Sequence, residues 1–142
     1  MERAFIISNN PKVWQAYPGS QKIEGSLRQV LVHARNLIHL GCSVINHPLA
    51  GSVQLNETPF KSLILTAKSK TVDDRSVRLM ESAMEVLNHS PALERKWSER
   101  VIRDFQRMDL SLLQSAVDSL PAGFILEGGS LPLPEREEER NL

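Results

Sequence analysis

The stretch HPLAGS at residues 47–52, which NETP at residues 56–59 continues, stands between two runs of strand-forming residues. Those runs, at 42–46 and 62–67, are short, apolar and rich in β-branched side chains, which is typical of buried strands. The loop between them holds a histidine, a Gly-Ser pair, an amide, a carboxylate and two prolines. A long irregular loop in a compact domain is usually functional or disordered, and the two prolines favour an ordered loop. We therefore expect the polar chemistry of this protein to centre on it.

Upstream of this loop, the pattern alternates between strands and helices. Residues 4–8 form a short apolar run that predicts the first strand. A short helix over residues 11–17 is expected next, because Asn10 is a good N-cap and a proline follows it. Ser26 forms a capping box with Gln29, and this box opens the helix with the clearest apolar face.

Downstream of the loop, the chain is expected to be helical. Residues 73–89 carry apolar side chains at helical spacing, and Ser90-Pro91 indicates the start of a second helix. Asp109 is predicted to cap a third helix that ends at Pro121.

These elements predict a single α/β domain over residues 1–127, followed by a flexible tail at 128–142. The domain is expected to hold a small, mostly parallel sheet of about four strands, covered by helices, with a helical C-terminal half. The strands that end at Ser8 and Asn46 are joined through helices, so we expect them to lie side by side and parallel. The strand at 62–67 can run in either direction, because a loop of about thirteen residues can return it both ways.

The composition excludes several classes of protein. The 142 residues carry 17 basic and 17 acidic side chains, and a net charge of zero argues against non-specific binding to nucleic acid or to an anionic membrane. No apolar run approaches the length of about 20 residues that a membrane-spanning helix needs. Cys42 is the single cysteine, so no disulfide forms within the chain, which suits the reducing cytoplasm.

Polar side chains follow the two strands that are expected to be neighbours, and ligands bind beyond the carboxyl ends of parallel strands. A helix that opens at Pro11 would point its N-terminus into the same crevice, which suits a small anion. The alternative is that Asn9 and Asn10 only cap and turn the chain. The candidate ligand-binding residues are Ser8, Asn9, Asn10, His47, Gly51, Ser52, Asn56 and Glu57.

A second hypothesis treats the loop as the site of a small enzyme. His47 and Glu57 would then form an acid/base pair, although Glu57 can equally brace the loop. Gly51-Ser52 could place backbone N–H groups near a phosphate, but the lysine of a P-loop is missing. The four histidines show no metal-ligand spacing, so no metal site is expected.

The second-half helices carry more apolar surface than one thin sheet can cover. Met80, Met84, Trp97 and Phe105 are the side chains expected to be in excess. We therefore expect a homodimer that forms through one of these helices.

The loop and three other segments resemble the GrdX family, whose members are small proteins encoded beside the selenium-dependent glycine reductase system of anaerobic bacteria. The most specific part of the resemblance is HPLAGS at 47–52 followed by NETPF at 56–60. The opening IISNNP at 6–11, the stretch at 35–41 and DFQ at 104–106 are also similar to the family. The resemblance covers roughly residues 4–120. Leu55 departs from it, because a proline is expected before the Asn-Glu-Thr-Pro run.

This resemblance implies a cytoplasmic protein of an anaerobe with an accessory role in amino-acid reduction. It carries no reaction, no cofactor and no catalytic residue. Three hypotheses therefore stand at this point: an accessory protein that binds a small anionic ligand, a small enzyme, and an assembly factor that contacts a subunit of a reductase complex.

Overall fold

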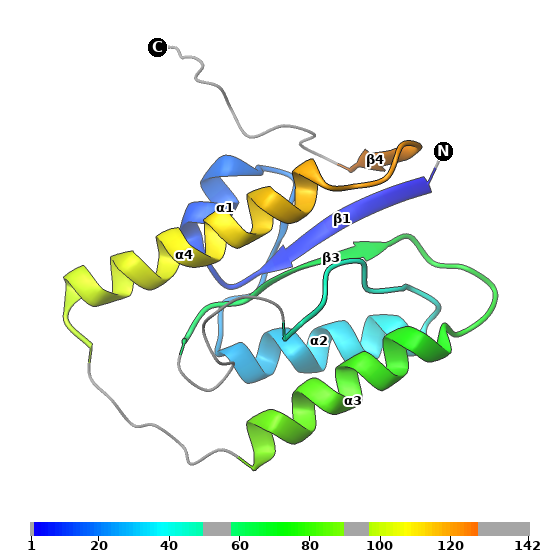
Figure 1. The fold of residues 1–142 in the computed structure, drawn as a ribbon, viewed down its shortest axis with the longest axis horizontal. Coiled ribbons are helices and arrows are strands. Elements are labelled where there is room, and N and C mark those ends of the chain that lie inside the picture. Colours follow the sequence, from blue (N-terminus) through cyan, green and yellow to red (C-terminus); the bar gives the residue numbers. More distant parts are fainter. Residues whose placement is uncertain (1, 50–57, 90–96, 128–142) are drawn as a thin grey trace.

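The computed structural model describes residues 2–49, 58–89 and 97–127. It shows a mixed sheet between two layers of helices (Figure 1). The elements in chain order are β1 (Glu2–Ser8), α1 (Pro11–Ala16), β2 (Gln21–Lys22), α2 (Leu27–His39), β3 (Ser62–Thr66), α3 (Asp74–Asn88), α4 (Glu99–Asp118) and β4 (Phe124–Leu126).

β1 is the central strand of the four-stranded sheet. One of its edges pairs with β3 in the antiparallel sense, from Ala4 opposite Thr66 to Ser8 opposite Ser62. Its other edge pairs in the parallel sense with β2 near the end of β1 and with β4 near its start. The α/β class is thus confirmed, but the expectation of a mostly parallel sheet is wrong. The apolar run of β3 is almost wholly buried, so it shows no alternation from which its direction can be predicted.

Residues 42–46, which were expected to form a strand, make only one isolated antiparallel bridge, from Val44 to Leu65 of β3. At the end of this segment the side-chain Oδ1 of Asn46, and not a backbone carbonyl, accepts the N–H of Ile64. The segment and β1 run in the same direction, as predicted, but β3 lies between them. The expectation that they are neighbours is therefore wrong, although both segments reach the end of the sheet where β3 begins.

Two hydrophobic clusters hold helices on opposite faces of the sheet (Figure 1). α2 and α3 cover the face that includes Ile7, Leu63 and Leu65, whereas α1 and α4 cover the face that includes Ile6 and Ile64. Adjacent residues of β1 and of β3 therefore point into different layers, as the pleat of a strand requires.

The predicted helix caps are confirmed at α1 and α2. The Asn10 side chain accepts the N–H of Lys12, with Pro11 in the first turn. Ser26 Oγ accepts the N–H of Gln29, and Gln29 Oε1 accepts the N–H of Ser26, which completes the capping box. These bonds satisfy donors that the first turn of a helix leaves without partners.

The second half departs from expectation in three ways. α4 is one continuous helix, so Asp109 is not an N-cap but a buried residue in the middle of it. Met80 is fully buried in the core and is not surplus surface. β4 was not predicted, because its three residues are too short a signal. The expected helix start at Ser90-Pro91 and the expected flexible tail at 128–142 lie outside the described residues.

Candidate functional site

Polar side chains are buried together at the end of the sheet where β1 stops and β3 begins. We call this group the sheet-end cluster, and it comprises Ser8, Asn10, Lys61, Ser62 and Asp109. Ser8 is the last residue of β1, and Asn10 is the N-cap of α1. Ser62 is the first residue of β3, and Asp109 lies in the middle of α4. Each of these side chains is at most 8% exposed. A buried polar group is costly unless it is hydrogen-bonded, so the bonds within this cluster decide its role.

A directed chain of hydrogen bonds links four members of the cluster. Ser62 Oγ donates to Asp109 Oδ2 at 2.7 Å, and Asn10 Nδ2 donates to the same oxygen at 3.0 Å. Because the single hydroxyl proton of Ser62 is used there, the Ser8 hydroxyl is the donor in the 2.6 Å bond between the two serines. The backbone N–H of Asn10 in turn donates to Ser8 Oγ at 2.9 Å. This series of hydrogen bonds ends at Asp109 Oδ2, which accepts both of its bonds. Donors that point at a carboxylate oxygen favour the ionised form of the carboxyl group.

Asp109 and Lys61 influence each other electrostatically. Burial raises the pKa of the Asp109 carboxyl, while the hydrogen bonds from Asn10 and Ser62 and the charge of Lys61 act in the opposite direction. Burial lowers the pKa of the Lys61 ammonium, and Asp109 opposes that shift. The described residues form three ion pairs within 4.0 Å, all between exposed side chains, and none of them includes Lys61.

Asn9 fixes the geometry around this end of the sheet. Its Oδ1 accepts the N–H of Lys61 at 2.9 Å, and its Nδ2 donates to the carbonyls of Pro59 at 2.8 Å and Gly25 at 3.1 Å. The side chains of Ser8, Asn9 and Asn10 thus form hydrogen bonds within the protein, and these bonds hold them in position. We call these three predicted site residues the floor of the candidate site. Pro59 and Lys61 hold the downstream end of the loop against that floor.

The other predicted site residues belong to the loop. His47 is exposed, and its Nδ1 accepts the N–H of Leu49 at 3.0 Å, which places the proton of a neutral imidazole on Nε2. Gly51, Ser52, Asn56 and Glu57 lie outside the described residues. The structure therefore brings Ser8, Asn9 and Asn10 together, and the expected pair of His47 with Glu57 stays a prediction.

Lys61 and Asp109 were missed by the sequence reasoning, although both left a signal. Lys61 directly precedes β3, whose first four residues are buried, so a lysine at this position is close enough to the sheet to be buried with them. Asp109 stands four residues before the buried Leu113, which puts it on the inward face of α4. A carboxylate on the apolar face of a helix is the stronger of the two signals.

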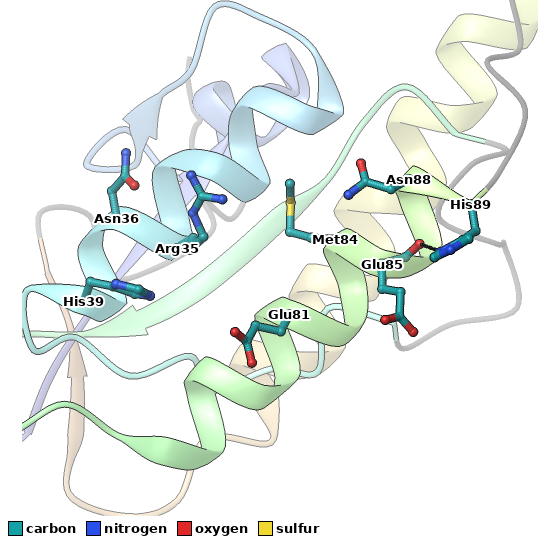
Figure 2. A pocket seen from close by; sticks show the side chains of 8 residues that line it. All are labelled: Arg35, Asn36, His39, Glu81, Met84, Glu85, Asn88 and His89. Carbon is teal, nitrogen blue, oxygen red and sulfur yellow. Dashed lines mark hydrogen bonds between the residues drawn. The ribbon is translucent and has the colours of Figure 1, made fainter.

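A second polar region is the groove between α2 and α3, which has a volume of ≈ 600 Å³ (Figure 2). Every residue that lines it, apart from Met84, is exposed. Arg28 Nη1 donates to the side-chain Oδ1 of Asn88 at 2.7 Å beside the groove, and His89 Nδ1 lies 2.9 Å from the backbone carbonyl oxygen of Glu85. The lining residues are Arg35, Asn36, His39, Glu81, Met84, Glu85, Asn88 and His89. No sequence motif marks this groove, and its charges are solvated, so it ranks below the sheet end as a candidate site.

Two features are absent from the described part of the chain. None of their helices is both long and apolar enough to cross a membrane. No three of their histidine, cysteine, aspartate and glutamate side chains are grouped so that they could hold a metal ion.

Comparison with known proteins agrees with the resemblance in the His-Pro loop. No curated protein and no solved structure matches the chain. A family model described as GrdX-like protein matches residues 5–118, which include the second half of β1, the whole loop, the sheet-end cluster and α4. Because the match covers most of the chain, the protein belongs to the GrdX-like family.

Proposed function

We propose that this GrdX-like protein is an accessory protein that binds a small anionic ligand at the end of the sheet, where the His-Pro loop meets Lys61. The observation that carries this proposal is the burial of the Lys61 ammonium. Lys61 as a whole residue is 8% exposed, yet no described carboxylate lies within 4.0 Å of its nitrogen.

A buried ammonium is expensive unless an anion compensates it. Asp109 acts on Lys61 only from beyond 4.0 Å, because the two form no ion pair within that distance, and Asp109 Oδ2 accepts its bonds from Ser62 and Asn10. A ligand phosphate or carboxylate beside Lys61 would supply the missing contact. The bonded floor of Ser8, Asn9 and Asn10 would hold Lys61 in position with little loss of entropy on binding.

The loop supplies the remaining contacts in this proposal. His47, Gly51, Ser52, Asn56 and Glu57 precede Pro59 in the sequence, and Asn9 binds the backbone at Pro59 and Lys61. Backbone N–H groups near the Gly-Ser pair, a hydroxyl and an imidazole suit an anion with several oxygen atoms. We place this function in the cytoplasm of an anaerobe, as the family resemblance implies.

The test compares melting temperatures in phosphate, sulfate or acetate with those in chloride at equal ionic strength. A ligand at about a hundred times its dissociation constant adds roughly 2.7 kcal/mol of stability, which is about 5–10 °C for a chain of this length. Chloride controls for general screening. Equal melting temperatures in all four salts would refute the proposal.

Variants locate the anion. Lys61→Met should abolish the shift, because it removes the ammonium but keeps the backbone N–H that binds Asn9. Lys70→Met is the matched control, since Lys70 follows β3 in the sequence and is exposed. His47→Ala and Ser52→Ala should each reduce the shift. A full shift in Lys61→Met would contradict the role given to Lys61.

A second candidate function is contact with another protein, such as a subunit of a reductase complex. The observation that favours it is a set of exposed apolar side chains on α4, namely Val101, Met108 and Leu112. Pull-down of a defined reductase subunit by the wild type, and its loss in Met108→Lys, would support this function.

A further inference from the structure

The side chains at the end of the sheet already use their hydrogen-bond donors within the protein. The amide N–H groups of Asn9 bind two backbone carbonyl oxygens, and those of Asn10 bind one backbone carbonyl oxygen and Asp109 Oδ2. The hydroxyls of Ser8 and Ser62 donate within the sheet-end cluster. The side chains of the floor and of Ser62 therefore have no N–H or O–H left for a ligand.

The Lys61 ammonium differs from these groups. It carries three N–H donors and takes part in none of the ion pairs of the described residues. A carboxylate presents two oxygen atoms to such a donor, whereas a phosphate or a sulfate presents four. An ion oxygen that is buried without a donor costs free energy, so this small set of donors suits the ion with fewer oxygens.

The buried charges at the sheet end are already balanced. Lys61 and Asp109 are the charged side chains among the buried residues that the structure describes. The bonds that Asp109 Oδ2 accepts from Ser62 and Asn10 favour the ionised carboxylate. A bound anion therefore adds negative charge to a site that holds one cation and one carboxylate.

The loop adds no lysine or arginine to this balance. Residues 47–60 contain neither, and their one acidic residue is Glu57. Lys22 is the cation of β2, opposite Ser8 on the edge of β1 away from β3. It is exposed, and its ammonium lies 5.7 Å from the centre of the Trp14 ring. Lys22 is thus solvated and in contact with an aromatic ring.

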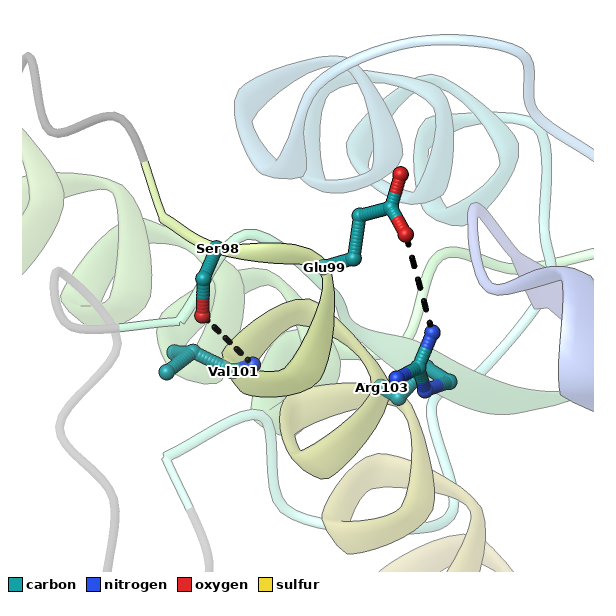
Figure 3. Close-up of polar contacts among 4 residues, drawn as sticks. All are labelled: Ser98, Glu99, Val101 and Arg103. Carbon is teal, nitrogen blue, oxygen red and sulfur yellow. Dashed lines mark hydrogen bonds and ion pairs between the residues drawn. The ribbon is translucent and has the colours of Figure 1, made fainter.

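α4 brings negative charge to the sheet end and keeps its positive charges on the surface. In Figure 3, Arg103 reaches toward Glu99, with which it forms an ion pair at 4.0 Å. Arg107 pairs with Asp104 at 3.6 Å, and all the arginines of α4 are exposed. Asp109 is the charged side chain that this helix buries.

We propose that the ligand beside Lys61 is a small monocarboxylate, and that the negative charge of Asp109 disfavours ions of double charge such as sulfate. This inference rests on the proposed function and narrows its ligand to one chemical class. The cost of removing an ion from water rises with the square of its charge, whereas its attraction to one ammonium rises only in proportion. A second charge also doubles the repulsion from Asp109. We expect a monocarboxylate to bind about tenfold or more tightly than sulfate.

The test uses three probe ions at pH 7, namely acetate, methanesulfonate and sulfate. Acetate and methanesulfonate carry one charge, whereas methanesulfonate and sulfate share a tetrahedral shape, so the three ions separate charge from shape. Melting temperatures of the full chain are measured over a concentration series of each ion, with chloride keeping the ionic strength constant. Lys61→Met is measured in parallel and its shift is subtracted, because these salts also act on the whole protein surface. Acetate should give the lowest dissociation constant and sulfate the highest.

The outcomes distinguish this inference from the proposed function. If no ion shifts the wild type more than it shifts Lys61→Met, the proposed function fails and the inference fails with it. If sulfate or methanesulfonate binds as tightly as acetate, the anion site stands and the monocarboxylate is overturned.

Asp109→Asn tests the residue to which the charge selectivity is assigned. The amide keeps an oxygen that can accept the bonds from Ser62 and Asn10, but it removes the negative charge. The preference for acetate over sulfate should fall about tenfold in this variant. Asp104→Asn is the matched control and should keep the wild-type preference, because Asp104 is exposed on the same helix. A folded Asp109→Asn with the wild-type preference would overturn the role of Asp109, whereas the wild-type preference decides the ligand class whether or not this variant folds.

Discussion

The sheet-end cluster and the α2–α3 groove contain the same kinds of side chain in opposite environments. Ser8 and Asn10 are fully buried, and every hydrogen bond between members of the cluster is 3.0 Å or shorter. In the groove, Arg35 and Glu81 are exposed and take part in none of the ion pairs of the described residues. Water can reach the polar groups of the exposed groove and form hydrogen bonds with them. The polar groups of the buried cluster can find hydrogen-bond partners only in the protein or in a ligand. Burial, rather than residue type, therefore gives a polar group its energetic weight here.

This difference also separates two kinds of function. A buried, bonded cluster has fixed geometry, so it can hold a small ligand in one orientation. The exposed groove is limited to weak, salt-sensitive contacts, because its charges are screened.

Asp109→Ala should have the largest effect on stability. It leaves the Ser62 hydroxyl and one Asn10 N–H without their acceptor and removes the charge that compensates Lys61. Unsatisfied buried groups cost about 1–3 kcal/mol each, so we expect a loss of about 3 kcal/mol in urea unfolding. Glu81→Ala, in the groove, is the control and should stay within about 0.5 kcal/mol of the wild type. Similar losses in both variants would erase the contrast between the two regions.

Ser62→Ala should have a smaller effect, because Asp109 keeps the bond from Asn10. The change removes the acceptor of the Ser8 hydroxyl and one donor to the carboxylate. We expect a loss of about 2 kcal/mol in the free energy of unfolding, which is measured through the decrease in the midpoint temperature of thermal unfolding. Ser82→Ala, on the exposed side of α3, is the matched serine control. A smaller loss in Ser62→Ala than in Ser82→Ala would show that the hydrogen-bond chain contributes nothing.

Local signals in the sequence were enough for the elements that depend on neighbouring residues. The caps at Asn10 and Ser26 rely on bonds over two or three positions, and both were predicted correctly. The burial of the apolar run in β3 also followed from its composition. Family membership followed from the His-Pro loop, and the family match confirms it.

Features that depend on distant residues were not predictable in this way. The direction of β3 is decided by its pairing with β1, fifty-four positions away at Ser8 and Ser62. Asp109 resembles an N-cap in sequence, and only its contacts with Asn10 and Ser62 explain why α4 continues through it. The same long-range contacts bond the side chains of Ser8 and Asn10 within the protein, and their contact with a ligand stays a prediction.

Tyr17→Phe should have the smallest effect on stability at neutral pH. It should leave the stability unchanged or raise it, whereas Asp109→Ala and Ser62→Ala lower it. The Tyr17 hydroxyl is buried and has no hydrogen-bond partner among the described residues. Removing a buried unsatisfied group is neutral or stabilising, by about 1 kcal/mol at most. A clear loss of stability at pH 7 would mean that this hydroxyl has a partner that the described residues do not supply.

At alkaline pH the difference between Tyr17→Phe and the wild type should grow. Burial, with a smaller contribution from Asp118, raises the pKa of Tyr17 from 10.0 to about 12. Because the unfolded chain loses this proton first, the wild type loses stability as the pH rises from 10.0 to about 12, whereas Tyr17→Phe does not lose this part. Asp118→Asn should retain most of the loss, since burial is the larger cause. Tyr17 is the only tyrosine, so its ultraviolet absorbance reports the ionisation directly. Titration near pH 10 in the folded protein would show that water reaches the hydroxyl, and that the α1–α4 layer is less closed than the sheet-end cluster beside it.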